Sequence, residues 1–280
     1  MTELRRIARL HPALRDDIGD LVTRRPVPGP KLDRLGAFLF LNHHGPQVYP
    51  PNSHGLPFGP HPHRGFETVT FILEGELAHK DTGGHESIIG PGGVQWMTTG
   101  SGLIHEEVSP ESFKKSGGAM EILQLWVNLP ARLKMTTPRY TGLQVEALPV
   151  IEDEGASVQL LSGEYMGRTG PFETLTGVFM SVVRLTTGAG AYFDGLKDRD
   201  VFLYVVRGSI SVDGTKADKF NLVELTSGDA VEIFAGEDSL ILFGHAEPLN
   251  EPVVAYGPFV MNTSAEIQQA IDDYRAGKFG

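Results

Sequence analysis

A chain of 280 residues is long enough to bury the core of one large domain or of two domains of ordinary size, without a disulfide or metal staple. The sequence contains no cysteine, which excludes disulfides, thiolate nucleophiles and thiolate metal sites, so a metal must rest on His, Asp and Glu. The formal net charge of -11 repels phosphate backbones, and Lys and Arg are scattered, which argues against direct nucleic-acid binding.

The N-terminal residues 1–21 carry arginines, but Arg, His, Pro or Asp interrupts each apolar stretch. They therefore lack the apolar segment of a secretory signal. The sequence also has no run that approaches the roughly 18 apolar residues of a membrane span. We therefore expect a soluble, cytoplasmic protein without a membrane partner.

Short apolar and β-branched runs, separated by 34 glycines and 19 prolines, follow one another through most of the chain. This rhythm predicts an all-β fold of many short strands joined by turns. The expected strands cover 66–73, 87–89, 95–97, 121–128, 158–161, 177–185, 201–206, 209–212, 221–225, 230–234 and 239–243.

A single well-marked helix is expected after residue 262. Residues 262–264 supply N-cap side chains, Glu266 falls in the first turn, and Arg275 and Gly277 mark the end.

Two glycine-punctuated segments resemble each other. The first passes through Gly75 and Gly100, and the second through Gly208 and Gly236, with offsets of 133 and 136 residues. We interpret them as two copies of one β-barrel, divided within 136–149, where prolines and a glycine break the strand pattern. The expected domains are 1–140 and 141–280.

Eight of the ten histidines lie between His43 and His105. The adjacent His43 and His44 could reach the mouth of a pocket in this part of the chain, but a solvated loop is the preferred interpretation. Two pairs in this window have i, i+2 spacing: His61 with His63, and His105 with Glu107.

On extended backbone such a pair points to one face, with Cα atoms about 6.7 Å apart. Two pairs on neighbouring strands can aim four side chains at one interior point, where imidazole and carboxylate bind a first-row metal. Glu106 is out of phase, so strand phase selects Glu107. The alternative reading is that these histidines belong to a His-rich loop or an ordinary core.

The second copy tests this reading. The same offsets give the residues of the second copy that correspond to His61, His63, His105 and Glu107. These residues are Asp194, Leu196, Ile241 and Phe243, a set of side chains that cannot hold a metal. The second barrel is therefore expected to lack metal ligands.

Five motifs closely resemble the pirin family of the cupin superfamily. They are HPHRGFETVT at 61–70, LEG at 73–75, QWM at 95–97, GSGLIHEE at 100–107 and QLWVNLP at 124–130. The resemblance is dense from about residue 36 to 140 and weaker beyond 148. It implies two tandem cupin barrels of the jelly-roll type, closed by a short C-terminal helix.

The resemblance also implies one Fe(II) or Fe(III) ion, held by His61, His63, His105 and Glu107. The general cupin pattern instead places its glutamate at Glu67, so that alternative stays open. Three histidines and a carboxylate also suit Mn, Ni, Cu or Zn.

Some pirin relatives oxidise the flavonol quercetin with O2, and others act as redox-responsive partners of transcription factors or enzymes. The resemblance implies either a quercetin 2,3-dioxygenase-like enzyme or a metal-dependent regulatory protein with a protein partner. In the enzyme, Glu107 is the candidate general base. The expected substrate pocket is lined by apolar, aromatic and amide side chains: Phe40, Phe58, Trp96, Met97, Gln124 and Trp126.

Overall fold

A computed structural model describes residues 2–280, and within that range the chain groups into two compact units. The unit called the first barrel here comprises residues 15–24, 40–146 and 249–280. The second barrel comprises the N-terminal residues up to Leu14, residues 25–39 and residues 147–248. This grouping differs from the expected halves 1–140 and 141–280 because segments near both ends belong to the other unit. That residues 1–140 and 141–280 are two independently folding domains stays a prediction.

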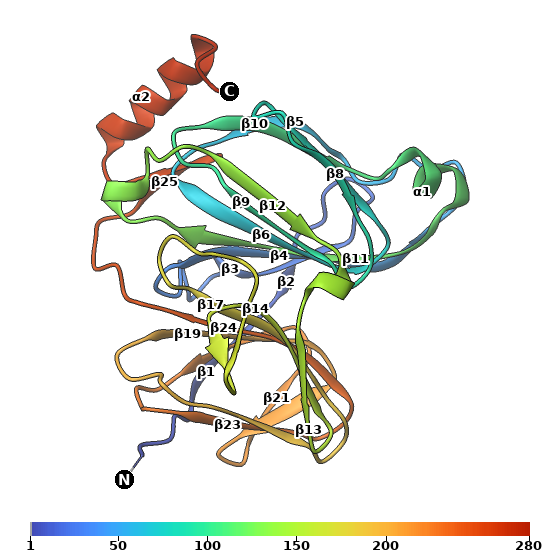
Figure 1. The fold of residues 1–280 in the computed structure, drawn as a ribbon, viewed down its shortest axis with the longest axis vertical. Coiled ribbons are helices and arrows are strands. Elements are labelled where there is room, and N and C mark those ends of the chain that lie inside the picture. The colour runs from blue at the N-terminus through green and yellow to red at the C-terminus, as the bar shows by residue number, and fades with distance from the viewer. Residues whose placement is uncertain (1) are drawn as a thin grey trace. The chain divides into compact units, whose positions relative to one another are not determined.

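The first barrel is built from a seven-stranded and a four-stranded antiparallel sheet (Figure 1). In sheet order the larger one contains β12 (Arg139–Leu143), β9 (Val94–Thr98), β6 (Phe66–Glu74), β11 (Gly118–Asn128), β4 (Phe38–Tyr49), β3 (Thr23–Val27) and β2 (Leu14–Arg15). The smaller one contains β5 (Phe58–His63), β10 (Leu103–Val108), β7 (Leu77–Asp81) and β8 (Glu86–Ile89).

The second barrel repeats this plan. Its seven-stranded sheet contains β1 (Ile7–Pro12), β22 (Asn221–Leu225), β19 (Asp200–Arg207), β24 (Ser239–Ala246), β17 (Phe179–Leu185), β14 (Ala156–Ser162) and β13 (Val150–Asp153). Its four-stranded sheet contains β18 (Gly190–Phe193), β23 (Val231–Ala235), β20 (Ser209–Val212) and β21 (Thr215–Asp218). A small hairpin joins β15 (Glu164–Tyr165) and β16 (Arg168–Thr169).

The matching sheet orders correct one detail of the sequence alignment. β10 has β23 as its counterpart, not β24. Aligning β7 with β20 at their preceding glycines makes Val231 and Ile233 the counterparts of His105 and Glu107. The 136-residue offset had assigned Ile241 and Phe243 to these positions. All four of these second-barrel residues belong to a buried apolar core. The second-barrel counterparts of His105 and Glu107 are therefore apolar, as expected, but they are Val231 and Ile233.

Helices are few in the described part of the chain: α1 (Glu111–Ser116), α2 (Ser264–Arg275) and the 3-10 turns η1 (Ala131–Leu133) and η2 (Val145–Ala147). A capping box between Thr263 and Glu266 starts α2, as the N-cap pattern predicts. The hairpin of β25 (Val254–Tyr256) and β26 (Phe259–Met261) precedes α2 (Figure 1) and shares an apolar cluster with it.

The prediction of an all-β fold closed by a short helix is confirmed. Within residues 2–280, neither helix is long and apolar enough to cross a membrane.

A buried lysine ties the closing segment to the first barrel. Lys134 is 1% exposed, and its Nζ donates to the carbonyl oxygens of Gly65 and Val260, each at 2.9 Å, and to Asn128 Oδ1 at 2.8 Å. Three acceptors satisfy the three donors of an ammonium group, which compensates for its burial.

Replacing this lysine by an apolar residue of similar length is expected to destabilise the first barrel. Lys134→Met leaves three buried acceptors unpaired, and each such group costs about 1–3 kcal/mol. Calorimetric unfolding should show a lower midpoint than for Lys115→Met, a matched change at an exposed lysine. Equal midpoints for the two variants would contradict the assigned role of Lys134.

Candidate metal centre

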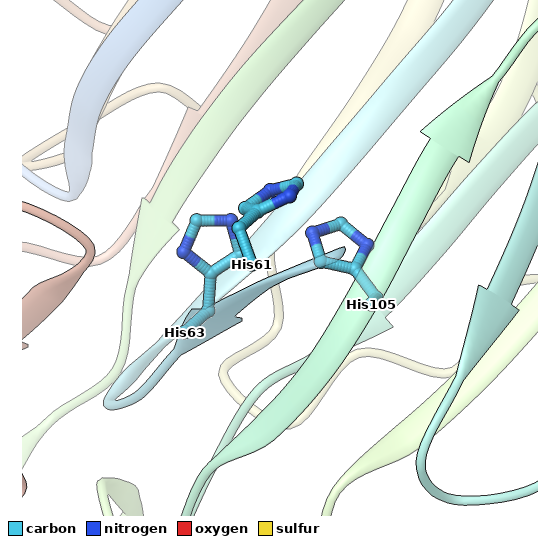
Figure 2. A group of neighbouring side chains, drawn as sticks. All are labelled: His61, His63 and His105. Atoms are coloured by element: carbon cyan, nitrogen blue, oxygen red, sulfur yellow. The ribbon is translucent and has the colours of Figure 1, made fainter. Parts of the chain in front are cut away.

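Two neighbouring strands bring three histidines together (Figure 2). β5 pairs antiparallel with β10, so that His61 lies opposite His105 and His63 opposite Leu103. Strand alternation then turns His61, His63 and His105 to one face. One nitrogen from each ring lies within 4.8 Å of the others. This spacing suits a common ion.

Backbone carbonyls fix the tautomers of two of these rings. His61 Nδ1 lies 2.7 Å from Gly59 O, and His63 Nδ1 lies 3.3 Å from Pro258 O. A carbonyl only accepts, so each Nδ1 carries the proton and each Nε2 keeps its lone pair. His63 Nε2 and both nitrogens of His105 are buried without a hydrogen-bond partner in the described chain. Orphaned lone pairs oriented in this way fit a divalent first-row metal.

The electrostatic environment keeps the rings neutral, which is the form that binds metals. Burial, with a smaller contribution from the neighbouring His61, lowers the pKa of His63 to about 3. Burial also lowers the pKa of His105 well below its usual value. The pKa of His61 is lowered by burial, although its bond to Gly59 opposes the shift.

Glu107 lies in the barrel interior among amide and hydroxyl donors. Its Oε1 accepts from Thr70 Oγ1 at 3.1 Å and from Gln95 Nε2, and its Oε2 accepts from Gln124 Nε2 at 2.5 Å. Burial raises the pKa of Glu107 to about 7, against the effect of these bonds. Glu107 belongs to a second group of possible ligands, with His79 and His105. Its role as a ligand stays a prediction.

Two aromatic side chains fix the amides around Glu107. The Tyr140 hydroxyl donates to Gln95 Oε1 at 3.0 Å, and Trp126 Nε1 donates to Gln124 Oε1 at 3.1 Å. Each amide therefore turns its NH2 group toward the carboxylate. The network joins the two sheets of the barrel at the centre.

Glu67 occupies a different environment. It lies on β6 three residues before Thr70, so it points to the opposite face from the Thr70 hydroxyl that donates to Glu107. Its Oε1 accepts from Thr98 Oγ1 at 2.6 Å, and burial raises its pKa to about 7. Glu67 is in neither group of possible ligands, which argues against it as the fourth ligand.

A cavity of about 180 Å³ is lined by His61, His63 and Glu107, among others. Four of the expected substrate-binding residues line it: Phe40, Phe58, Gln124 and Trp126. Trp96 and Met97 are not among its lining residues. Trp96 follows Gln95 on β9 and therefore faces away from the interior, whereas Met97 shares the face of Gln95 but pairs with Thr68 farther along the strand.

One cavity residue, Asn42, was missed, and another, His44, was assigned to a solvated loop in preference to the pocket mouth. Asn42 and His44 follow Phe40 at two-residue intervals on β4 and line the same cavity. The expectation of a solvated loop at His43 and His44 is wrong, because both side chains are buried, bonded to Glu121 and Thr23 respectively. Strand alternation from Phe40 was the signal that could have found Asn42 and His44.

Comparison with known families identifies this arrangement. Residues 20–127 match the Pirin model, and residues 180–280 match the pirin C-terminal cupin domain. The chain belongs to the pirin family. This result confirms the resemblance seen in the motifs, and with it the tandem cupin fold.

Among relatives of this pirin, human pirin is 36% identical over 266 residues, covering 92% of this chain and 87% of the human one. A Pseudomonas aeruginosa protein provisionally named quercetin 2,3-dioxygenase is 39% identical over 248 residues, covering 88% and 87%. The crystal structure of quercetin 2,3-dioxygenase from Acinetobacter baumannii superposes with a TM-score of 0.91 at 33% identity and covers 99% of both chains.

Removing one histidine should weaken metal binding. In His63→Ala one buried lone pair is lost, and we expect at least a tenfold weaker affinity for Fe(II) or Zn(II), a loss of the size that supporting partners of such ligands produce. Calorimetric titration and elemental analysis measure the effect. His54→Ala, which removes an exposed histidine, is the matched control, and equal affinities in the two variants would rule out His63 as a ligand.

Proposed function

We propose that this pirin is a mononuclear iron dioxygenase that oxidises quercetin-like flavonols with O2. His61, His63 and His105 hold the ion, with Glu107 as the fourth ligand. The convergence of buried, neutral imidazoles with unpaired nitrogens carries the proposal. Further support comes from the dioxygenase names of the Pseudomonas and Acinetobacter relatives.

Bound iron would supply a Lewis acid and a redox partner for oxygen. The chain itself orients an aromatic substrate. Phe40 stacks on Trp126 with ring centroids 4.6 Å apart, and Phe66 lies against the same indole at 4.3 Å. Phe40 and Trp126 of this stack line the cavity beside His61 and His63, where they offer an apolar surface to one ring of a flavonol.

When its carboxylate is released from the ion, Glu107 would accept the proton of a substrate hydroxyl. In this step the substrate O–H bond breaks, and the proton passes to a carboxylate oxygen of Glu107. Glu107 lines the cavity together with His61 and His63, so its carboxylate lies beside a substrate bound there. Gln95 and Gln124 hold the carboxylate in position before the proton arrives.

The size of the cavity favours a second candidate function. Pockets for drug-sized ligands usually measure about 300–1,000 Å³, and this cavity has about 180 Å³. Such a cavity admits part of a flavonol. The alternative is therefore a metal-dependent regulatory protein, in which the redox state of the ion alters a surface that a protein partner recognises.

Oxygen uptake distinguishes the two functions. The iron-loaded protein is mixed with quercetin under air, and O2 and flavonol are followed together. Equimolar, enzyme-dependent consumption supports the dioxygenase. Absence of turnover with quercetin and with related flavonols overturns it and favours the regulatory protein. Elemental analysis of protein from its native host decides between iron and Mn, Ni, Cu or Zn.

Glu107→Gln tests whether the carboxylate of Glu107 is the proton acceptor. The change keeps the volume but removes the proton acceptor, so kcat for quercetin should fall about 10²–10⁴-fold. Metal content, measured in parallel, reports any loss of a ligand. Glu106→Gln, one residue away and out of phase, is the control. Full activity in Glu107→Gln would refute the role of Glu107.

A further inference from the structure

A second group of possible ligands lies beside the three histidines. His79, His105 and Glu107 each offer one ligand atom, and these atoms lie within 4.8 Å of one another. β7 and β10 pair so that His79 stands opposite Glu107. Both groups contain His105 of β10. The other histidines of the first group lie on β5, and His79 lies on β7, the strand on the other side of β10.

The ring of His79 is held like that of a metal ligand. Its Nε2 lies 3.0 Å from Asp81 Oδ2, and the His85 backbone N–H donates to Asp81 Oδ1 at 3.1 Å. Its ring stacks on Tyr140, with centroids 4.0 Å apart and planes inclined by 11°. A carboxylate that orients a histidine through one nitrogen is the usual support of a ligand that binds through the other.

The bond to Asp81 determines which nitrogen of His79 is free. A carboxylate accepts, so Nε2 carries the proton and Nδ1 keeps the lone pair. The His79 side chain is fully buried, and its Nδ1 finds no hydrogen-bond partner within residues 2–280. An unpaired buried nitrogen costs about 1–3 kcal/mol, which a bound cation would offset.

His105 differs from the other three rings. Neither of its nitrogens meets a hydrogen-bond partner in the described part of the chain, so the protein does not select its tautomer. Its ring centroid lies 4.4 Å from that of His61 and 5.5 Å from that of His79. Figure 2 shows one ring nitrogen of His105 directed toward His61 and His63, and the other directed away from them.

We propose that one divalent ion has two positions in this barrel, which are selected by the tautomer of His105. In the first position it is bound by His61, His63 and His105, with Glu107 as the proposed fourth ligand, and in the second by His79, His105 and Glu107. A neutral imidazole has a single lone pair. The positions are therefore occupied one at a time.

The second position has chemistry of its own. Two imidazoles and one carboxylate form the donor set that non-haem ferrous sites use, with open positions left on the metal. Glu107 accepts three hydrogen bonds, and a carboxylate offers about four lone-pair sites. It therefore keeps one for a cation. The inference rests on metal binding at the first position proposed above, and it does not require flavonol turnover.

Nitrogen NMR on the wild-type chain tests the tautomers directly. In protein labelled with ¹⁵N-histidine and freed of metal, we expect His61 and His63 protonated at Nδ1, His79 protonated at Nε2, and His105 with averaged shifts of both tautomers. Addition of Zn(II) should shift His79 Nδ1 as well as His61 Nε2. A single fixed tautomer for His105, or an unchanged His79 Nδ1, would overturn the proposal.

Metal titration of variants provides a separate test. The double variant His61→Ala/His63→Ala should still bind one Zn(II), at least tenfold more weakly than the wild type. Adding His79→Phe, which retains the stack on Tyr140, should weaken binding at least a further tenfold. Adding His54→Ala, which removes an exposed histidine, should not.

Loss of all zinc binding in the folded double variant contradicts the second position, as does an unchanged affinity after His79→Phe. Because zinc binding is measured without flavonol, these results are independent of whether the wild-type protein oxidises quercetin.

Discussion

Burying an imidazole nitrogen without a hydrogen-bond partner costs free energy, and the first barrel does this at His63, His79 and His105. The surrounding chain maintains the arrangement. Carbonyls and a carboxylate fix the tautomers of His61, His63 and His79, and desolvation keeps the rings neutral. A barrel interior built in this way is less stable by itself than an apolar one. A bound cation would make the arrangement favourable.

The second barrel shows the other solution for the same sheet plan. Where β10 carries His105 and Glu107, β23 carries Val231 and Ile233, both with no exposed area. Opposite Val231 lies Phe193 on β18, as His61 lies opposite His105 on β5. Apolar packing fills this interior, so the second barrel folds around its own core. The two barrels thus share one strand order but differ inside: the first has a polar interior and the second an apolar one.

Much of the first barrel could be predicted because its signals are local. The i, i+2 spacing of His61 with His63 and of His105 with Glu107 placed these residues together, and glycine punctuation revealed the repeat. Strand phase was applied to Glu106 but not to Trp96, which therefore appeared among the pocket residues. Four residues separate β7 from β8 and β8 from β9, but only two separate β20 from β21 and β21 from β22, so the offset of 136 misaligned β10 with the second barrel.

The remaining strand partners could not be predicted, because they are far apart in the sequence. β1 joins the second barrel by pairing with β22, and residues 249–280 join the first. Few local patterns report such partners, because they depend on contacts between distant segments of the sequence. The carbonyl of Pro258 is an example: no motif marks it, yet it fixes the tautomer of His63.

The contact between Pro258 and His63 also orders events during translation. The four proposed ligands leave the ribosome early, while the strand and helix that complete their barrel are made after the whole second barrel. Until then the His63 ring lacks the acceptor that holds its proton on Nδ1. A chain that ends just before residue 249 would carry all ten histidines but not the Pro258 carbonyl. The orientation of a candidate ligand at position 63 thus depends on a residue 195 positions later in the chain.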